Sequence, residues 1–393
     1  MASRVVRVGV VAYEMEGRPS GVGRFLEGLL SGLAELAEAE EPARADLERW
    51  SFQLFFKGEP FEHPLFAARD RRGRLLFEPI FDRRPSWRPI AWEQLRLPTL
   101  LRAHGAGAVF SPGYSLPLLS DLPGFLTLHD LSFERRPEEF APRERWRRRL
   151  LARWGARRAA RVFASSRFGG DELMRLYGLA RRRITLLSAA VAPRFAARPA
   201  DPEGEALALA GLGVRPPYLL WVGTLLPRRP IGWALAALGR ERARHPELTL
   251  VVAGADRMPG HGAFAEELAA SGVADAVVRL PFVPDALLPA LYREAELTLY
   301  PSAYEGFGLP PLESLAAGTP AVTTPGQALD DLWPGDPYRA PFELEGFCAM
   351  VKTALADRRR DAVVSEGQAR VATLSWRASA ARLLATLAEE LPA

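Results

Sequence analysis

The chain has 393 residues, enough for two domains, and its 48% apolar and 25% charged residues are typical of a soluble globular protein. The net charge of +4 is small and no nucleic-acid-binding motif accompanies it, so no nucleic-acid partner is expected. No run approaches the roughly 18 apolar residues that span a bilayer, and the N-terminus does not resemble a signal peptide. One cysteine, Cys348, excludes an internal disulfide and fits a reducing compartment. We therefore expect a cytoplasmic protein.

The first half of the chain alternates apolar segments with helical patterns. Residues 4–13 predict a buried parallel strand, followed by a glycine-rich turn and by leucines at helical spacing. Strand, glycine-rich turn and helix form the opening unit of a doubly wound domain. The turn contains Gly21, Val22 and Gly23, whose spacing does not fit the dinucleotide fingerprint. Further strands are predicted at 52–56, 108–110, 125–127, 162–166 and 184–187.

A histidine follows one of these strands. His129 comes directly after residues 125–127, at the edge where open α/β sheets place ligands. A histidine elsewhere would more often be structural, so this position makes His129 a candidate site residue.

Residues 142–161 contain nine arginines, and Trp146, Leu150 and Trp154 lie four apart on one face of a predicted helix. Two interpretations remain open. The apolar face can pack on the first domain, which we favour, or the helix can contact a membrane surface, where arginine meets anionic lipid and tryptophan lies at the interface. The second interpretation would place the protein peripherally at the inner membrane face.

The second half repeats the pattern. Residues 196–217 are rich in proline, alanine and acidic residues and predict an interdomain linker that can contain one short helix. A second Rossmann-like unit begins at 218, with strands expected at 218–224, 248–253 and 276–280.

Residues 300–325 contain most of the candidate ligand-binding groups of the second half. A strand end, a turn with two glycines and a short helix over 309–317 would direct several backbone N–H groups one way, at the positive end of the helix dipole. Glu305 lies on the turn and Glu313 about two helical turns further, and paired carboxylates accept hydrogen bonds from diols. The alternative is that Glu305 is a helix-terminal charge and Glu313 a solvated helix residue.

The run from Tyr304 to Pro310, Tyr-Glu-Gly-Phe-Gly-Leu-Pro, followed by Glu313 and by Ala-Ala-Gly-Thr-Pro, resembles the signature of the retaining nucleotide-sugar glycosyltransferases of family 4. The resemblance implies the α/β GT-B fold, in which two Rossmann-like doubly wound domains face a cleft. It places an acceptor-side domain at 1–195, the linker at 196–217 and the donor domain at 218–375. A C-terminal helix, 376–391, would cross back to the first domain.

The resemblance also implies roles for individual residues. Glu305 would contact the donor sugar, Glu313 the ribose, and His129 would point toward the reacting sugar, so His129 and Glu305 are the catalytic candidates. Base selectivity would lie near Phe282 and Val283. The donor-binding candidates besides Glu305 are Gly21, Val22, Gly23, Thr224, Arg228, Arg229, Gly254, Phe282, Val283, Gly306, Phe307, Gly308, Leu309 and Glu313.

The departing diphosphate needs positive charge. No Asp-x-Asp pair and no His/Cys cluster is present, so neither a metal nor another cofactor is expected, and arginines would take this role. Similar proteins have Pro-Arg-Lys-Asn where this chain has Pro227-Arg228-Arg229-Pro230. In a chain whose only lysines are Lys57 and Lys352, the change to Arg229 can be compositional, because guanidinium also binds phosphate. The alternative is a degenerate site.

The sequence thus predicts a hexosyltransferase that moves a sugar from a nucleoside-diphosphate sugar to a glycan or lipid-linked acceptor with retention of configuration, in polysaccharide biosynthesis. By association, the donor would be GDP-mannose. A catalytically silent GT-B subunit that partners an active transferase is the alternative, motivated by Arg229-Pro230 and by Ala189-Ala190, where similar proteins have Asn-Gly. A nicotinamide-dependent oxidoreductase is disfavoured, because neither half carries the full glycine fingerprint and its ribose-binding acid.

Overall fold

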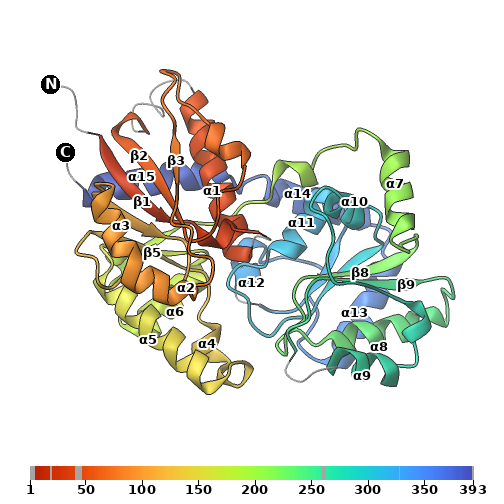
Figure 1. The fold of residues 1–393 in the computed structure, drawn as a ribbon. Helices are drawn as coiled ribbons and strands as arrows, with labels where there is room; N and C mark the ends of the chain where they lie inside the picture. Colours follow the sequence, from red (N-terminus) through yellow and green to blue (C-terminus); the bar gives the residue numbers. More distant parts are fainter. Residues whose placement is uncertain (1–4, 18–19, 40–46, 259–262, 327, 392–393) are drawn as a thin grey trace. The chain divides into compact units, whose positions relative to one another are not determined.

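The computed structural model describes residues 5–17, 20–39, 47–258, 263–326 and 328–391. The chain divides into two compact units (Figure 1). Unit 1 comprises Met1–Ala190 and Leu374–Ala393, and unit 2 comprises Val191–Thr373. Arg4, the first residue of the first predicted strand, lies outside the described residues.

The described part of unit 1 contains a parallel sheet of seven strands in the order β3-β2-β1-β4-β5-β6-β7. Its strands are β1 (Val6–Val11), β2 (Trp50–Phe56), β3 (Phe77–Phe81), β4 (Ala108–Ser111), β5 (Gly124–Leu128), β6 (Arg161–Ala164) and β7 (Ile184–Leu186). Chain order reverses between β1 and β4, which makes this the topological switch point of the sheet.

Helices cover both faces of this sheet. They are α1 (Gly21–Glu38), α2 (Pro89–Ala91), α3 (Leu97–Ala103), α4 (Ser132–Arg135), α5 (Pro142–Arg158), α6 (Arg167–Tyr177) and α15 (Trp376–Glu390). Apolar side chains of α3, α5 and α6 share one core with β1, β4, β5 and β6. Because these strands are buried on both faces, they carry nearly continuous apolar runs.

The C-terminal helix α15 belongs to unit 1 and lies side by side with α1 (Figure 1). Two glycines of α1 permit this contact: a Cβ on Gly28 would lie 2.2 Å from Cε2 of Trp376, and one on Gly32 would lie 2.2 Å from the Trp376 carbonyl oxygen. At the other end of α15, Arg161 binds Glu389 at 2.9 Å and Glu390 at 2.6 Å. The predicted return of this helix to the first domain is confirmed.

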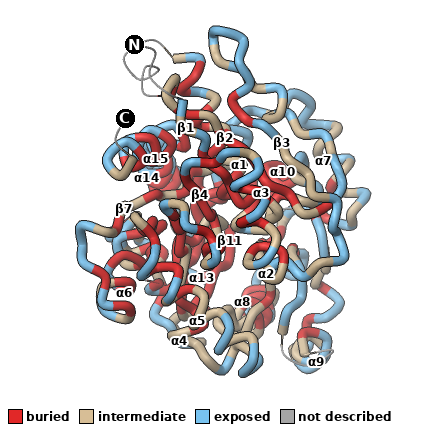
Figure 2. Tube along the Cα trace, turned by 60° about the vertical axis from the view of Figure 1, so that its left-hand side comes forward, coloured by how far each residue is buried: buried red, intermediate tan, exposed pale blue. Residues whose placement is uncertain are grey.

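The described part of unit 2 contains a parallel sheet of five strands in the order β10-β9-β8-β11-β12. The strands are β8 (Tyr218–Val222), β9 (Thr249–Ala253), β10 (Val277–Leu280), β11 (Leu297–Tyr300) and β12 (Ala321–Thr323). Here the order reverses between β8 and β11. Figure 2 shows the buried chain, in red, along central strands such as β1, β4 and β11.

The helices of unit 2 are α7 (Pro202–Gly211), α8 (Ile231–Arg242), α9 (Ala263–Ala270), α10 (Leu288–Arg293), α11 (Leu309–Ala317), α12 (Ala328–Leu332), α13 (Leu344–Ala356) and α14 (Arg360–Val371). Residues 196–217, which the sequence predicted as a linker, contain α7 and lie within unit 2. Glu205 of α7 binds Arg293 of α10 at 2.7 Å, and Leu209 and Val214 are buried.

Candidate functional site

The candidate donor site of unit 2 lies at its switch point. The carboxyl ends of β8 and β11 are neighbours there, and open α/β sheets bind ligands at such an edge. The chain leaves β8 through a turn that carries Arg228 and Arg229, and it leaves β11 through a turn that carries Ser302 and Glu305. The Ala303 N–H donates to the Arg228 carbonyl at 2.8 Å, which joins the two turns.

Arg229 and Glu305 form a bidentate ion pair across these turns. Nε of Arg229 donates to Oε1 of Glu305 at 2.7 Å, and Nη2 donates to Oε2 at 2.9 Å. Oγ of Ser302 donates to the same Oε1 at 2.6 Å, and the Arg229 guanidinium carbon lies 5.0 Å from the centre of the Tyr300 ring. Both charged side chains are largely buried, so a fixed cation and a fixed anion stand side by side at the edge of the sheet.

The surroundings keep Glu305 ionised. Burial alone would raise the pKa of this carboxyl, but the charges of Arg229 and Arg228 and the hydrogen bond from Ser302 outweigh burial and lower it. Glu305 is therefore a carboxylate through the neutral range, and it is not merely a charge exposed at the start of a helix.

The turn into α11 is shaped by Gly308, whose φ of +85° lies in the left-handed region. A Cβ at this position would also lie 2.8 Å from Cδ2 of Leu329. Pro310 and Pro311 follow in the first turn of the helix and have no N–H. Amide donors for an anion must therefore come from the turn, up to and including Leu309, more than from the helix itself.

Glu313 lies on α11 and is 8% exposed, which rules out a solvated helix residue. Oη of Tyr292 donates to its Oε2 at 2.9 Å. One residue along, Oγ of Ser314 donates to the Thr319 carbonyl at 2.8 Å and lies 2.7 Å from Oγ1 of Thr298, whose hydroxyl can donate to it. These buried bonds fix α11 against β11 and α10.

Other donor-binding candidates lie at the same edge of the second sheet. The Thr224 carbonyl accepts from Nη1 of Arg229 at 3.3 Å. Gly254, with φ +136°, follows β9, and a Cβ there would lie 2.1 Å from the Gly223 carbonyl oxygen. After β10, Phe282 is 48% exposed whereas Val283 is buried.

Sequence reasoning missed two polar residues at this edge. Ser302, which bonds Glu305, could have been suspected from its position just after a strand. Arg279 donates to the carbonyls of Val252 at 2.9 Å and Leu280 at 3.0 Å and also to that of Gly254, and no motif marks it.

In unit 1, His129 follows β5 and lies in a dense environment. Its Nε2 lies 2.7 Å from the Pro112 carbonyl, which can only accept, so Nε2 carries the proton. Its Nδ1 then accepts from Oγ of Ser165 at 2.9 Å. Burial lowers the pKa of His129, against the opposing effects of Pro112 and Asp130, so the ring is neutral near pH 7. The ring of Phe25 packs edge-on against the His129 ring, with 4.6 Å between the two ring centroids.

The predicted glycine-rich turn is the first turn of α1. Ser20 caps this helix, because its Oγ accepts from the Gly23 N–H at 3.2 Å and donates to Oε2 of Glu14 at 2.7 Å. Gly21 and Val22 precede Gly23 at the start of the helix. Like His129, they lie at the carboxyl edge of the first sheet.

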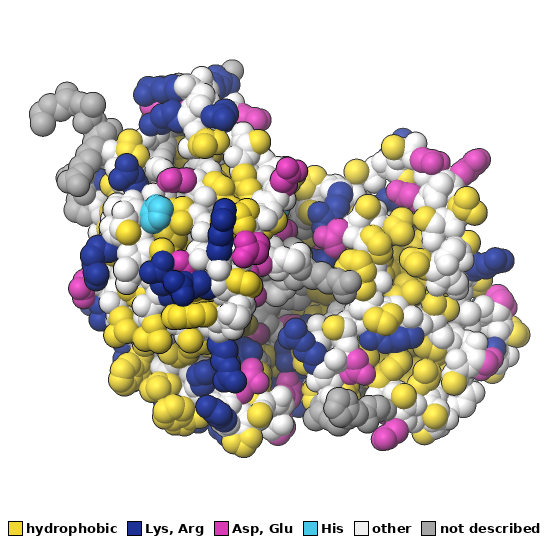
Figure 3. Space-filling model, in the orientation of Figure 1, with side chains coloured by type: hydrophobic (Ala, Val, Ile, Leu, Met, Phe, Trp, Pro, Cys, Tyr) yellow, Lys and Arg dark blue, Asp and Glu magenta, His cyan; other side chains and the backbone are white. Residues whose placement is uncertain are grey.

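The arginine-rich helix α5 exposes its tryptophans. Trp146 is 67% exposed and Trp154 is 57% exposed, whereas Ala152, Gly155 and Ala156 face the core. The favoured prediction, that the tryptophan face packs on the first domain, is therefore wrong. The small residues pack better because they let the helix approach the sheet closely. Figure 3 shows dark-blue basic side chains among yellow apolar ones where Figure 1 draws α4 and α5.

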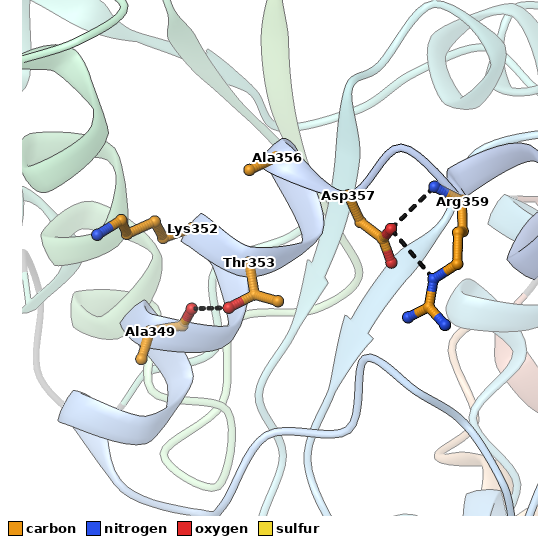
Figure 4. A pocket seen from close by; sticks show the side chains of 6 residues that line it. All are labelled: Ala349, Lys352, Thr353, Ala356, Asp357 and Arg359. Atoms are coloured by element: carbon orange, nitrogen blue, oxygen red, sulfur yellow. Dashed lines mark hydrogen bonds and ion pairs between the residues drawn. The ribbon is translucent and has the colours of Figure 1, made fainter.

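An open hollow of about 580 Å³ lies on α13, away from the candidate donor-site residues of unit 2 (Figure 4). Lys352, Thr353, Asp357 and Arg359 are among the residues that line it. Beside it, Arg360 binds Glu296, which precedes β11, so the hollow lies toward the amino edge of the second sheet. Among the described residues, no group of three or more His, Cys, Asp or Glu could hold a metal ion, and no helix is long and apolar enough to cross a membrane.

Comparison with known proteins identifies related chains. Residues 216–355 match the family described as glycosyl transferases group 1, and residues 42–195 match glycosyltransferase family 4. Over 380 residues the chain is 28% identical to O-antigen chain mannosyltransferase B of Escherichia coli. The alignment covers 91% of this chain and 93% of that protein.

Solved structures share the fold at lower identity. WaaG, a glycosyltransferase involved in lipopolysaccharide biosynthesis, aligns with a TM-score of 0.70 at 19% identity over 99% of this chain and 100% of its own. HepE of Anabaena, solved in complex with UDP and glucose, aligns with a TM-score of 0.69 at 16% identity over 98% of this chain and 100% of its own. The two family matches, one to each half of the chain, together with two doubly wound parallel sheets and the returning C-terminal helix, identify a glycosyltransferase of the family 4 type with the GT-B fold.

Proposed function

We propose that this glycosyltransferase moves a hexosyl group, with retention of configuration, from a nucleoside-diphosphate sugar to a glycan or lipid-linked acceptor in polysaccharide synthesis. The observation that carries the proposal is the buried pair of Arg229 and Glu305 at the switch point of unit 2. The E. coli relative named as an O-antigen chain mannosyltransferase supports mannose, and hence GDP-mannose, as the donor. HepE, solved with UDP and glucose, supports a nucleotide-sugar donor in general.

Each group at this edge has a proposed part in binding the donor. Arg228, Arg229 and the turn amides from Gly306 to Leu309 offset the charge of the diphosphate without a metal. Glu313 accepts from the ribose hydroxyls, and the backbone near Phe282 contacts the base.

The proposed transfer needs no side chain as a base. The bond between the anomeric carbon and the diphosphate oxygen breaks, and the acceptor oxygen bonds to the same carbon from the same face. The acceptor proton passes to a phosphate oxygen of the leaving diphosphate, so that a glycoside and a nucleoside diphosphate result. Glu305, held ionised, stabilises the positive charge that develops on the sugar, and His129 has a proposed part in positioning the reacting groups.

Calorimetry with GDP-mannose, UDP-glucose, UDP-N-acetylglucosamine and dTDP-rhamnose, combined with assays of slow hydrolysis, tests the proposal. We expect binding and hydrolysis of GDP-mannose, and loss of both in Arg229→Met. Arg240→Met is the control, because Arg240 also makes a bidentate contact with a glutamate, here through Nη1 and Nη2 to Glu345 on the exposed surface of α8. Absence of binding to every donor would refute the proposal and favour a catalytically silent subunit.

We further propose that α5 contacts an anionic membrane surface. Its exposed Trp146 and Trp154 lie on one face with exposed arginines such as Arg143, Arg147 and Arg157, which suits a headgroup layer. After centrifugation with phosphatidylglycerol vesicles, the wild-type protein should be found in the vesicle pellet and the Trp146→Ser/Trp154→Ser variant should stay in the supernatant. Leu207→Ser, at a residue 74% exposed on α7, should behave as wild type. Equal sedimentation of all three would contradict the proposal.

A further inference from the structure

A buried carboxyl group lies at the switch point of the first sheet. Tyr13 follows β1 and Ser115 follows β4, and both contact Glu93, which lies on the π-helical turn Trp92–Arg96. Ligands of open α/β sheets bind at the switch point, and π-helical turns are frequent at functional sites. The place of Glu93 in the fold therefore suggests a functional part.

The hydrogen-bond partners of Glu93 are all neutral. Glu93 is 1% exposed. Its Oε2 accepts from Oη of Tyr13 at 3.4 Å, its Oε1 accepts from Nε2 of Gln94 at 2.9 Å, and Ser115 supplies a further bond. Burial raises the pKa of Glu93 to about 7, aided by the charge of Glu14 and opposed by these hydrogen bonds.

A chain of short contacts leads from Glu93 to His129. Gln94, held by Glu93, donates from Nε2 to the Leu116 carbonyl at 2.7 Å and accepts from the Leu118 N–H at 2.9 Å. The segment 112–118 is thus tied to the π-helical turn at one end. At its other end, the Pro112 carbonyl accepts from Nε2 of His129 at 2.7 Å.

We propose that Glu93 is a protonation-dependent positioning residue: in its neutral form it holds the segment 112–118, and through the Pro112 carbonyl it holds the ring of His129. When Glu93 loses its proton, the buried negative charge draws its donors Tyr13, Gln94 and Ser115 closer, and the segment 112–118, which is bonded to Gln94, moves with them. The consequence for catalysis rests on the function proposed above, whereas the coupling between Glu93 and His129 does not.

Other charged groups near Glu93 do not account for a change between pH 7 and pH 8. Tyr13 has a raised pKa, because of burial and the neighbouring Glu93 and Glu14, and it stays neutral; Arg147 of α5 acts on Tyr13 as a permanent cation. Burial lowers the pKa of His129 below its ordinary value, so the ring is neutral at pH 7 and above. A change at His129 above pH 7 that the removal of the Glu93 carboxyl abolishes therefore reports Glu93.

Nuclear magnetic resonance of the full chain labelled with ¹⁵N-histidine tests the coupling. The chain has five histidines, and a His129→Gln variant assigns the ring signals of His129. We expect these signals to shift between pH 7 and pH 8 in the wild-type protein and to stay constant in Glu93→Gln, whose neutral amide mimics the protonated acid. In Glu172→Gln, which alters another buried carboxyl of unit 1, the shift should persist.

A second variant and an activity profile complete the test. Tyr13→Phe removes a hydrogen bond that stabilises the charged form, so the midpoint of the His129 shift should move to higher pH.

With Glu93 titrating near pH 7, kcat of the wild-type enzyme should fall about five-fold from pH 7 to pH 8, and Glu93→Gln should abolish that fall. A His129 shift that is unchanged in Glu93→Gln and Tyr13→Phe would overturn the proposal. Its loss in Glu93→Gln, in a protein without transferase activity, would refute the proposed function instead.

Discussion

Arg229 and Glu305, 76 residues apart in the chain, are joined by two hydrogen bonds of 2.7 and 2.9 Å at the carboxyl edge of the second sheet. Removing either charge alone leaves the other buried without its ion-pair partner. The pair therefore holds both groups in place before any ligand arrives, and a site that needs a fixed cation and a fixed anion gains preorganisation from it.

This burial predicts strong energetic coupling between the two residues. A double-mutant cycle on Arg229→Met and Glu305→Gln should give a coupling energy of about 3 kcal/mol in urea unfolding, because each single variant strands a buried polar partner. The same cycle on Arg240→Met and Glu345→Gln, whose contact is also bidentate but lies on the exposed surface, should give a clearly smaller value. Equal coupling in both cycles would mean that the burial of the first pair contributes nothing.

The individual members of the pair could be predicted from the sequence, but their contact could not. Arg229 and Glu305 lie in recognisable motifs, and both follow apolar strands. Their contact depends on β8 and β11 being neighbours, which local pattern does not encode. Glu93 carries no signal at all, because Trp-Glu-Gln-Leu-Arg is equally typical of a surface helix and only packing buries it.

The fold was predictable where strands are buried on both faces. The apolar runs that became β1, β2, β5 and β8 marked the doubly wound pattern. The strand β3 was missed: it lies at the sheet edge, is only partly buried and contains Pro79. The linker prediction for 196–217 rested on composition, and composition does not reveal that α7 packs on α10.

The lowered pKa of Glu305 predicts a stability change in acid. Because the folded-state pKa lies below the unfolded value near 4.5, the ionised group stabilises the fold above that pH. The stabilisation is lost as the pH falls through the folded pKa. The difference in unfolding free energy between the wild-type protein and Glu305→Gln should therefore be constant from pH 8 to pH 5 and should shrink below about pH 4.5. A constant difference down to pH 3 would contradict the assignment.

Glu93 predicts the opposite dependence. Its folded-state pKa of about 7 lies above the unfolded value, so the folded protein binds the proton more tightly. Stability should decline as the pH rises from about 4.5 to 7, by up to about 3 kcal/mol at about 1.4 kcal/mol per unit. Glu93→Gln removes this term, so its Tm should exceed that of the wild-type protein at pH 8 and approach it at pH 5. A Tm difference that is the same at both pH values would exclude a titrating Glu93.

The contact between α1 and α15 predicts that replacing Gly32 with alanine lowers the free energy of unfolding. Gly32→Ala would place a Cβ 2.2 Å from the backbone carbonyl oxygen of Trp376, which no rotation of a side chain can relieve. We expect a loss of about 1–3 kcal/mol of unfolding free energy, as for overpacking in a core, because the two helices must separate. Gly211→Ala is the matched control: Gly211 is also helical, but a Cβ there meets nothing within 4 Å. That variant should gain up to about 1 kcal/mol from helix propensity. Thermal unfolding of both variants checks the prediction, and equal effects would mean that α15 does not pack on α1 this closely in solution.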